Sequence, residues 1–337
     1  METLEISTDP AVEIACDESG WEGSSFAAAN SDVIAYASVR LDTEAAAECI
    51  RALRGRSGRH RHEYKASHFI RTADRSELAG FLGPAGPVNG HARVHVTHKS
   101  CFMIGRALDI FIGDFADTTS LGLRPDPRLT GQAAHLCRCG PDVFGWQPWQ
   151  AFLAVTNAVL RAHRHPQVHR PVDAFFDQVE ELRVLGKGSW VGEILDELRE
   201  GRVGGYAART RLLDNHVLEP VLEPLIPALA RTVLAWSGGT QPIAVVHDEQ
   251  SALTERRIRW MERVLAGPPL ELIRAPALGP FLRLRQVDSR EEPRVQVADV
   301  LAGVARKIAT SALMGQGDPE LTGLLQPYLD PASRWCA

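Results

Sequence analysis

Acidic side chains stand at the ends of two apolar runs in this 337-residue sequence. Residues 11–16 alternate small and apolar side chains, apart from one glutamate, and Asp17 follows directly. This pattern is typical of a buried strand. Residues 242–246 repeat the design, and Asp248 follows two positions later. A carboxylate at the end of a buried strand is costly unless a cation compensates its charge. The alternative is that Asp17 only caps a turn, because a Ser-Gly pair comes shortly after it.

A third acid, Asp299, lies in a segment whose apolar side chains recur at helical spacing, residues 295–307. On a neighbouring face of that helix it is aligned with Gln296, Gly303 and Arg306, at spacings of three, four and three residues. A glycine inside a helix costs about 1 kcal/mol relative to alanine. Its presence suggests that another group approaches the helix backbone closely at this point.

The fourth candidate acid is Glu63, which follows a basic stretch. If this piece is extended, Lys65 points to the same side and can brace the Glu63 carboxylate. Four carboxylates brought together repel one another, and Mg²⁺ or Mn²⁺, which prefer oxygen ligands, would resolve the conflict. Two such ions roughly 4 Å apart can activate water and stabilise the leaving oxygen of a phosphodiester. No Gly-x-Ser-x-Gly, P-loop or Gly-x-Gly-x-x-Gly motif offers a different chemistry.

Strands and helices are predicted to alternate around these acids, as in an α/β fold. Segments 24–29 and 33–41 are expected to continue the first strand as an antiparallel meander. Further strands are predicted at 91–98, 242–248 and 281–287, and helices at 42–54, 75–81, 102–115, 149–164, 192–200, 254–266 and 295–307. Two turn-rich pieces, 124–127 and 201–205, are predicted to bracket an insertion.

Length and composition allow a substantial core, because 45% of the residues are hydrophobic. We expect residues 10–115 and 218–312 to form the two parts of the core. Residues 116–217 are then a helical insertion, a lid or a partner surface, and residues 313–337 are a C-terminal tail. The start of the chain has neither a basic nor an apolar signal region, and no run reaches the roughly 20 apolar residues that span a bilayer. Six dilute cysteines favour a reduced, cytoplasmic protein.

The charge distribution bears on possible partners. A net charge of −5 argues against a protein that coats nucleic acid indiscriminately. Basic residues nevertheless gather in two segments, 51–65 and 256–263. Each is either an ordinary solvated face or a track for the phosphates of a nucleic acid.

In their order and context, these residues resemble the family catalogued as domain of unknown function 3800 (DUF3800), whose fold is ribonuclease-H-like. The resemblance covers roughly residues 10–115 and 218–310 and consists of Asp17-Glu18-Ser19-Gly20, Glu63-Tyr64-Lys65, Lys99 after its strand, His247-Asp248-Glu249 and Gln296-Val297-Ala298-Asp299. It implies a mixed five-stranded sheet with helices on both faces and a metal-dependent nuclease site at the edge of the sheet. The implied metal ligands are Asp17, Glu63, Asp248 and Asp299. Lys65 and Lys99 would neutralise charge or hold phosphate, and Glu18, Ser19, Gln296 and His247 would support the site.

Several residues of the insertion allow two interpretations. Asp177 also follows an apolar run and competes with Asp248 as a strand-end acid, although it equally fits a solvated helix face. Trp146, Trp149 and Phe152 could stack bases, but core packing is favoured.

Cysteines and histidines in segments 135–139 and 163–169 could bind zinc. A Cys-x-Cys pair without a second pair is not a standard zinc spacing, so scattered cysteines and surface histidines are favoured.

The leading hypothesis is therefore a metal-dependent nuclease that hydrolyses RNA or DNA with one or two Mg²⁺ or Mn²⁺ ions. Asp17 would bridge the metals, Glu63 and Asp299 would complete their first shell, and Asp248 would be a further ligand. One alternative is a non-catalytic module of the same fold whose insertion engages a protein partner. The other is a metal-dependent nucleotide phosphatase, which would place the acids in a closed pocket.

Overall fold

The computed structural model describes residues 11–21, 32–57, 66–113, 126–161, 167–214, 223–238, 241–266, 281–331 and 333. Within these ranges the chain is an α/β protein with a mixed five-stranded sheet, as the sequence predicts. The strands are β1 (Val12–Ser19), β2 (Val33–Val39), β3 (Ala92–His98), β4 (Ile243–Asp248) and β5 (Phe281–Val287). They are arranged in the order β3-β2-β1-β4-β5.

Strand direction brings the ends of several strands to one edge of the sheet. β1 pairs with β2 in antiparallel fashion and with β4 in parallel, and β5 continues in parallel beside β4. The carboxyl ends of β1, β4 and β5 therefore meet at the same edge. β3 runs antiparallel to β2, so its carboxyl end points to that edge as well.

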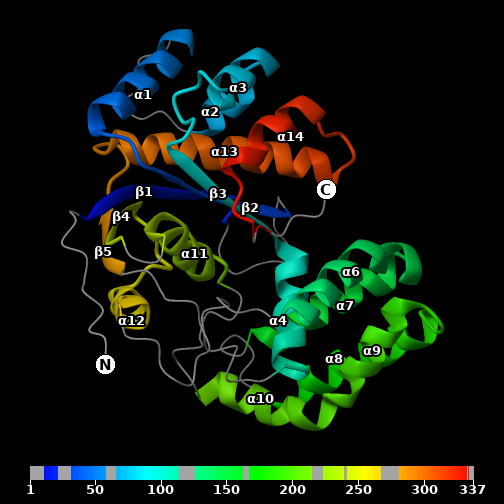
Figure 1. The fold of residues 1–337 in the computed structure, drawn as a ribbon. Coiled ribbons are helices and arrows are strands. Elements are labelled where there is room, and N and C mark those ends of the chain that lie inside the picture. The colour runs from blue at the N-terminus through cyan, green and yellow to red at the C-terminus, as the bar shows by residue number, and fades with distance from the viewer. Residues whose placement is uncertain are drawn as a thin grey trace.

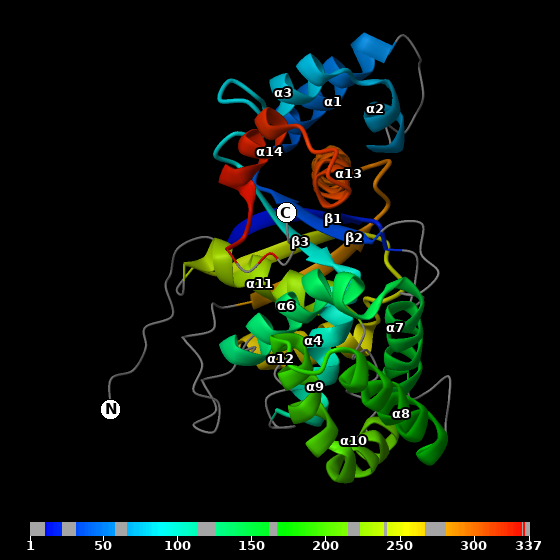
Figure 2. The ribbon, with the colours of Figure 1, turned by 90° about the vertical axis from the view of Figure 1, so that its right-hand side faces the viewer.

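One face of the sheet is covered by the long helix α13 (Pro293–Leu313), which packs over β1 and β2 (Figure 2). Small strand residues such as Ala15, Ala35 and Ala37 face this helix and are fully buried. Their size lets the helix lie close to the sheet. Around α13 lie α1 (Thr43–Ser57), α2 (Ala66–Thr72), α3 (Arg75–Leu82) and α14 (Pro319–Leu325).

The opposite face packs against α11 (Leu225–Ser237) and α12 (Glu255–Ala266), whose apolar sides form a core with alternate residues of β1 and β4. The two faces of the sheet are thus both buried, which explains why the central strands read as almost continuous apolar runs. Figure 1 shows the helices on both sides of the sheet.

The insertion forms a separate helical bundle with its own apolar core. It consists of α6 (Pro127–Phe144), α7 (Trp146–Leu160), α8 (His169–Leu185), α9 (Trp190–Glu200) and α10 (Arg202–Asp214). The helix α4 (Lys99–Phe111) leaves the carboxyl end of β3 and enters this bundle, so it connects the sheet to the insertion (Figures 1 and 2).

One sequence prediction for the insertion is wrong. Residues 201–205 were expected to form a turn, but α10 begins at Arg202. The reason is packing, because a Cβ at Gly205 would lie 2.9 Å from the ring of Phe176. The glycine therefore marks a close helix contact. In the segment 313–337, predicted as a C-terminal tail, Leu321, Leu325 and Tyr328 are buried in the same core as the apolar side of α13.

Most of the other predicted strands and helices are present, whereas α2, α6, α8 and α14 were not predicted. β5 has the predicted limits, and β1, β2, β3, β4, α1, α3, α12 and α13 overlap their predicted segments. The predicted strand at 24–29 lies outside the described residues. No helix in the described ranges is long and apolar enough to cross a bilayer.

Candidate functional site

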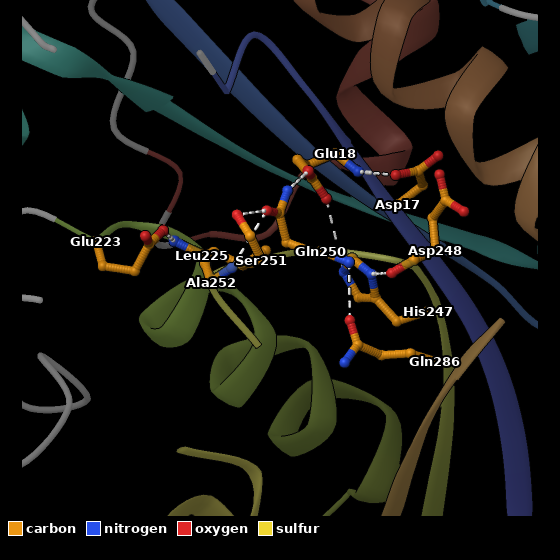
Figure 3. Close-up of polar contacts among 10 residues, drawn as sticks. All are labelled: Asp17, Glu18, Glu223, Leu225, His247, Asp248, Gln250, Ser251, Ala252 and Gln286. Atoms are coloured by element: carbon orange, nitrogen blue, oxygen red, sulfur yellow. Dashed lines mark hydrogen bonds and ion pairs between the residues drawn. The ribbon is translucent and has the colours of Figure 1, made fainter. Parts of the chain in front are cut away.

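Asp17 and Asp248 lie side by side at the carboxyl edge of the sheet. The parallel register pairs Cys16 with His247, so the two aspartates that follow occupy the same level on neighbouring strands. Alternation along a strand then turns both side chains toward the face that α13 covers. Figure 3 shows the two carboxylates next to each other. The sequence predicted both acids at strand ends, and the topology brings them together.

Asp299 reaches this edge from α13. The helix begins with Glu292 as its N-cap, whose side chain accepts a hydrogen bond from Arg294 N, and with Pro293 in the first turn. Asp299 lies two turns further along, close enough that its charge raises the pKa of Asp17. Three predicted acids from three distant segments therefore gather at one place.

The Asp17 carboxyl is the most buried of the three, at 7% exposure, whereas Asp248 and Asp299 are half-buried. Burial is the main reason that its pKa lies well above the ordinary value, and the charges of Glu18, Asp299 and Asp248 raise it further. Its backbone hydrogen bond from Glu18 N, at 2.8 Å, opposes this rise. Within the described residues no cation forms an ion pair with Asp17. Within this part of the chain, the buried Asp17 carboxyl is thus surrounded by other acids and is not compensated by a cation.

The spacing of the acids is wider than that of ligands around one small ion. Among the described residues only one group of three His, Cys, Asp or Glu side chains has ligand atoms that all lie within 4.8 Å of one another, and the three aspartates are not that group. Asp248 is also held by a hydrogen bond from Ser289 N to its Oδ1, at 3.1 Å. This bond fixes the loop between β5 and α13 against the end of β4.

Glu18 and His247 face the other side of the sheet. The Glu18 carboxylate accepts a hydrogen bond from Gln250 Nε2, and its Oε2 lies 3.7 Å from His247 Nε2 (Figure 3). His247 Nδ1 lies 2.9 Å from the carbonyl of Asp248, so this nitrogen is the donor. Glu18 and His247 therefore point away from the carboxylates of Asp17 and Asp248, and any support they give to the aspartates passes through the backbone of the two strands. They hold the strand ends from the opposite face.

The other supporting residues have different surroundings. Gln296 is buried, donates to Ser289 O at 2.8 Å and accepts from Arg54 Nη2 at 3.1 Å, so it ties α1 and the β5–α13 loop to α13. Ser19 is half-buried at the end of β1. Lys99 is only 4% exposed at the start of α4, and β2 lies between its strand and β1. The role of Lys99 in neutralising charge or holding phosphate stays a prediction.

Two predicted site residues, Glu63 and Lys65, lie outside the described residues, so the structure does not place them. Asp177 is described and is not at a strand end. It lies on an exposed face of α8, where it pairs with Arg202 at 3.4 Å, and its side chain is 71% exposed. The solvated helix face that the sequence allowed is the correct interpretation, and Asp248 is the acid that joins Asp17.

The cysteine next to Asp17 is not suited to act as a nucleophile. Cys16 precedes Asp17 but faces the opposite side of the sheet and is fully buried. Burial raises the pKa of its thiol to about 12, which keeps it protonated at neutral pH. Cys16 is therefore a packing residue.

The sequence aligns Arg306 with Asp299 on one face of the helix. The structure places the Arg306 side chain at the end of β1, beside Gly20. Its side chain crosses the end of β1, where its Cδ would lie 2.8 Å from a Cβ placed on Gly20. The side chain is half-buried, and its guanidinium has no hydrogen-bond or ion-pair partner within the described ranges. An uncommitted cation thus lies at the acidic edge.

Gly20 is required at this point of the chain. Its φ of +91° is a conformation that side-chain-bearing residues rarely adopt, and an added Cβ would collide with the carbonyl oxygen of Val33. We expect Gly20→Ala to lower the free energy of unfolding by about 1–3 kcal/mol or more, because strain and collision add. Urea unfolding measures this effect. Gly90→Ala is the control, since Gly90 also has a positive φ, +73°, but open space around it. Equal losses in the two variants would contradict the role of the Val33 contact.

The described parts of the two basic segments lie on opposite sides of the sheet. The described part of the first lies on α1, on the α13 side of the sheet, where Arg54 is held by Gln296. The second lies on α12, which packs against β5 on the opposite side. There Arg257 donates to Ala252 O at 2.8 Å and Arg259 lies 3.4 Å from Glu255.

Of the three aromatic residues in the insertion, Trp149 and Phe152 are buried in the bundle core, as favoured from the sequence. Trp146 is 67% exposed at the start of α7. Sequence reasoning missed Glu223, a buried acid on the Glu18 side of the sheet, because it stands in a proline-rich segment without periodicity (Figure 3).

Comparison with known proteins gives no relative: no protein-family model, no curated protein and no solved structure matches this chain.

Proposed function

We propose that this chain is a ribonuclease-H-like, metal-dependent nuclease that hydrolyses phosphodiester bonds of RNA or DNA at the acidic edge of its sheet. One observation carries the proposal. Asp17 is buried beside the carboxylates of Asp248 and Asp299, its pKa is raised by burial and by their charges, and no cation among the described residues compensates it. Such an arrangement is unfavourable for the fold alone and favourable for binding a cation.

The donor set suits Mg²⁺ or Mn²⁺. All three side chains offer carboxylate oxygens, which these ions prefer, and no sulfur or imidazole belongs to the group. Two ions about 4 Å apart spread their ligands more widely than one ion does, which agrees with acids that are close but not within one tight cage. In this proposal Asp17, which lies beside Asp248 and is influenced by the charge of Asp299, would be the ligand shared by the two ions.

Once bound, the ions would activate a water molecule and stabilise the leaving oxygen of the phosphodiester. The chain itself would do the rest. Asp17, Asp248 and Asp299 would hold the ions, the Ser289 hydrogen bond would keep Asp248 oriented, and Arg306 would contact a phosphate of the substrate. The mixed five-stranded sheet with helices on both faces is the architecture that the resemblance implies.

The test is a cleavage assay on labelled single- and double-stranded RNA and DNA, with Mn²⁺, with Mg²⁺ and with EDTA. We expect metal-dependent cleavage of at least one substrate, and a loss of at least about 100-fold in Asp299→Asn, because loss of a metal ligand exceeds the effect of losing a second-shell partner. Asp177→Asn, an exposed acid on α8, is the matched control and should cleave normally. Cleavage that persists in EDTA, or that survives in Asp299→Asn, would refute the proposal.

Arg306→Gln separates substrate contact from metal binding. Loss of a phosphate contact should raise KM and weaken the salt dependence of binding, while the Mn²⁺ requirement stays unchanged. The control is the same substitution, Arg211→Gln, at an arginine on α10 of the insertion.

A further inference from the structure

We propose a second metal site, for a thiophilic cation such as Zn²⁺, formed by His98, Cys101 and Cys137 where the sheet meets the insertion. This site is independent of the proposed nuclease centre, because it uses other residues and other donor atoms. The observation that carries it is the convergence of three soft or borderline ligands. Their ligand atoms all lie within 4.8 Å of one another, and no other such group exists among the described residues.

Three separate elements supply the ligands. His98 is the last residue of β3, Cys101 lies in the first turn of α4, and Cys137 comes from the middle of α6. His98 and Cys101 are adjacent because the chain passes directly from strand to helix, which places residues three apart on one side. Cys137 is brought in by the packing of α6 on α4, as Figure 1 shows for the two helices.

The geometry is close to that of a bound ion. The Nδ1 atom of His98 lies 3.0 Å from Cys101 Sγ and 3.3 Å from Cys137 Sγ. In a tetrahedral zinc site, with Zn–N near 2.0–2.1 Å and Zn–S near 2.3 Å, nitrogen and sulfur ligands lie about 3.5 Å apart. Shifts of a few tenths of an ångström therefore convert the hydrogen-bonded trio into a coordination sphere. The same nitrogen faces both sulfur atoms, which a single hydrogen bond does not require.

The chemistry of the donors selects the cation. Thiolates and imidazole bind Zn²⁺ or Cu⁺ strongly and Mg²⁺ poorly. Cys101 is buried, and His98 and Cys137 are half-buried, so the site is shielded but not sealed. The described cysteines form no disulfide, so neither sulfur atom is oxidised in a Cys–Cys bond. Binding releases the protons of the two thiols to solvent. Three protein ligands leave a fourth position for water or an added ligand.

The position of the site gives it a consequence for the fold. A cation held by β3, α4 and α6 would fasten the helical bundle of the insertion to the sheet. Because it binds only the folded arrangement, it would raise the melting temperature, and the rise would grow with the logarithm of its concentration once the site is saturated.

The experiment uses the full chain, reduced and stripped of metal, and titrates it with Co²⁺ as a spectroscopic substitute for Zn²⁺. We expect one Co²⁺ per chain, with thiolate-to-cobalt charge-transfer absorption that carboxylates do not produce, and displacement of Co²⁺ by Zn²⁺. Cys137→Ser and His98→Gln should each lose this absorption or weaken Zn²⁺ binding by more than about 100-fold, since even second-shell losses reach that size.

Cys139→Ser is the matched control. Cys139 is half-buried on the same helix, but two residues carry it about 200° around the axis from Cys137. This variant should bind Co²⁺ as the wild type does. Circular dichroism of each metal-free variant confirms that it is folded. Absence of thiolate absorption in the wild type would overturn the proposal, and so would equal losses in the Cys139 and Cys137 variants.

Discussion

Asp17→Asn is expected to abolish cleavage and, in the absence of metal, to make the protein harder to unfold. The first effect follows from the loss of the bridging ligand and should reach at least about 100-fold. The second follows from the surroundings of the carboxyl, which is buried next to three other acids that raise its pKa. Removing an uncompensated buried charge relieves a cost on the order of 1–3 kcal/mol.

Asp17→Asn is well suited to the site because the asparagine side chain has nearly the same shape as that of aspartate. Its Oδ1 can still accept the hydrogen bond from Glu18 N, which is 2.8 Å long in the native chain. Its amide nitrogen can donate to the carboxylates of Asp248 or Asp299, which now lack a competing negative neighbour. The variant therefore removes charge and repulsion without creating a cavity or an unsatisfied donor.

Thermal melts in EDTA and in millimolar Mn²⁺ measure both sides of this argument. In EDTA the variant should melt above the wild type, whereas Mn²⁺ should raise the melting temperature of the wild type and leave the variant nearly unchanged. Asp177→Asn should follow the wild type in both buffers, because its side chain is exposed and paired with Arg202. A variant that is less stable than the wild type in EDTA would show that Asp17 holds the fold together. The acids would then be a structural cluster, as in a non-catalytic module.

The acids could be found from the sequence because each follows a local pattern. Asp17 and Asp248 end apolar runs, and Asp299 lies at a fixed spacing on an amphipathic helix. Their meeting is a property of the topology, since β1 and β4 become neighbours only through a parallel pairing between segments more than 200 residues apart. Local patterns predict the elements, and long-range pairing determines which of their ends meet.

The residues that sequence reasoning missed lack such patterns. Along the chain Cys137 is grouped with Cys139. In space its partners are His98, at the end of a strand, and Cys101, on another helix. Only a His-x-x-Cys spacing across the junction of β3 and α4 could have suggested the pair, and this is a weak signal. In the same way, the glycines near Gly205 predict a turn, because the sequence does not show that Phe176 packs against Gly205.

Alternation along the strands also determines to which face of the sheet the residues beside Asp17 and Asp248 point. Glu18 and His247 stand next to Asp17 and Asp248 in the chain, and they were grouped with them as supporting residues. A strand turns successive side chains to opposite faces, so each pair of neighbours is divided between the two sides of the sheet. The result is a second polar cluster on the α11 side, which includes Glu223 (Figure 3).

Glu223→Gln is expected to stabilise the protein increasingly as the pH rises from about 4.5 to about 8. Glu223 is 7% exposed, just before α11, and its Oε1 accepts a hydrogen bond from Leu225 N at 3.2 Å. Burial raises the pKa of this carboxyl from 4.5 to about 8, with a smaller contribution from the charge of Glu18 and opposition from Arg257. At neutral pH the folded chain therefore keeps a proton on Glu223 that the unfolded chain releases.

The sign of the effect follows from this difference in proton binding. Below pH 4.5 both states are protonated, and the glutamate costs nothing relative to glutamine. Between pH 4.5 and about 8 only the folded state retains the proton, so the stability of the wild type falls as the pH rises, and above about 8 the loss is complete. A rise in pKa of this size corresponds to about 5 kcal/mol at most. Urea unfolding of both proteins in EDTA, at pH 5, 7 and 9, should show a growing advantage of Glu223→Gln. Glu255→Gln, at an 85% exposed side chain on α12, should show no such trend. A constant difference between Glu223→Gln and the wild type across this range would mean that Glu223 is ionised in the folded protein.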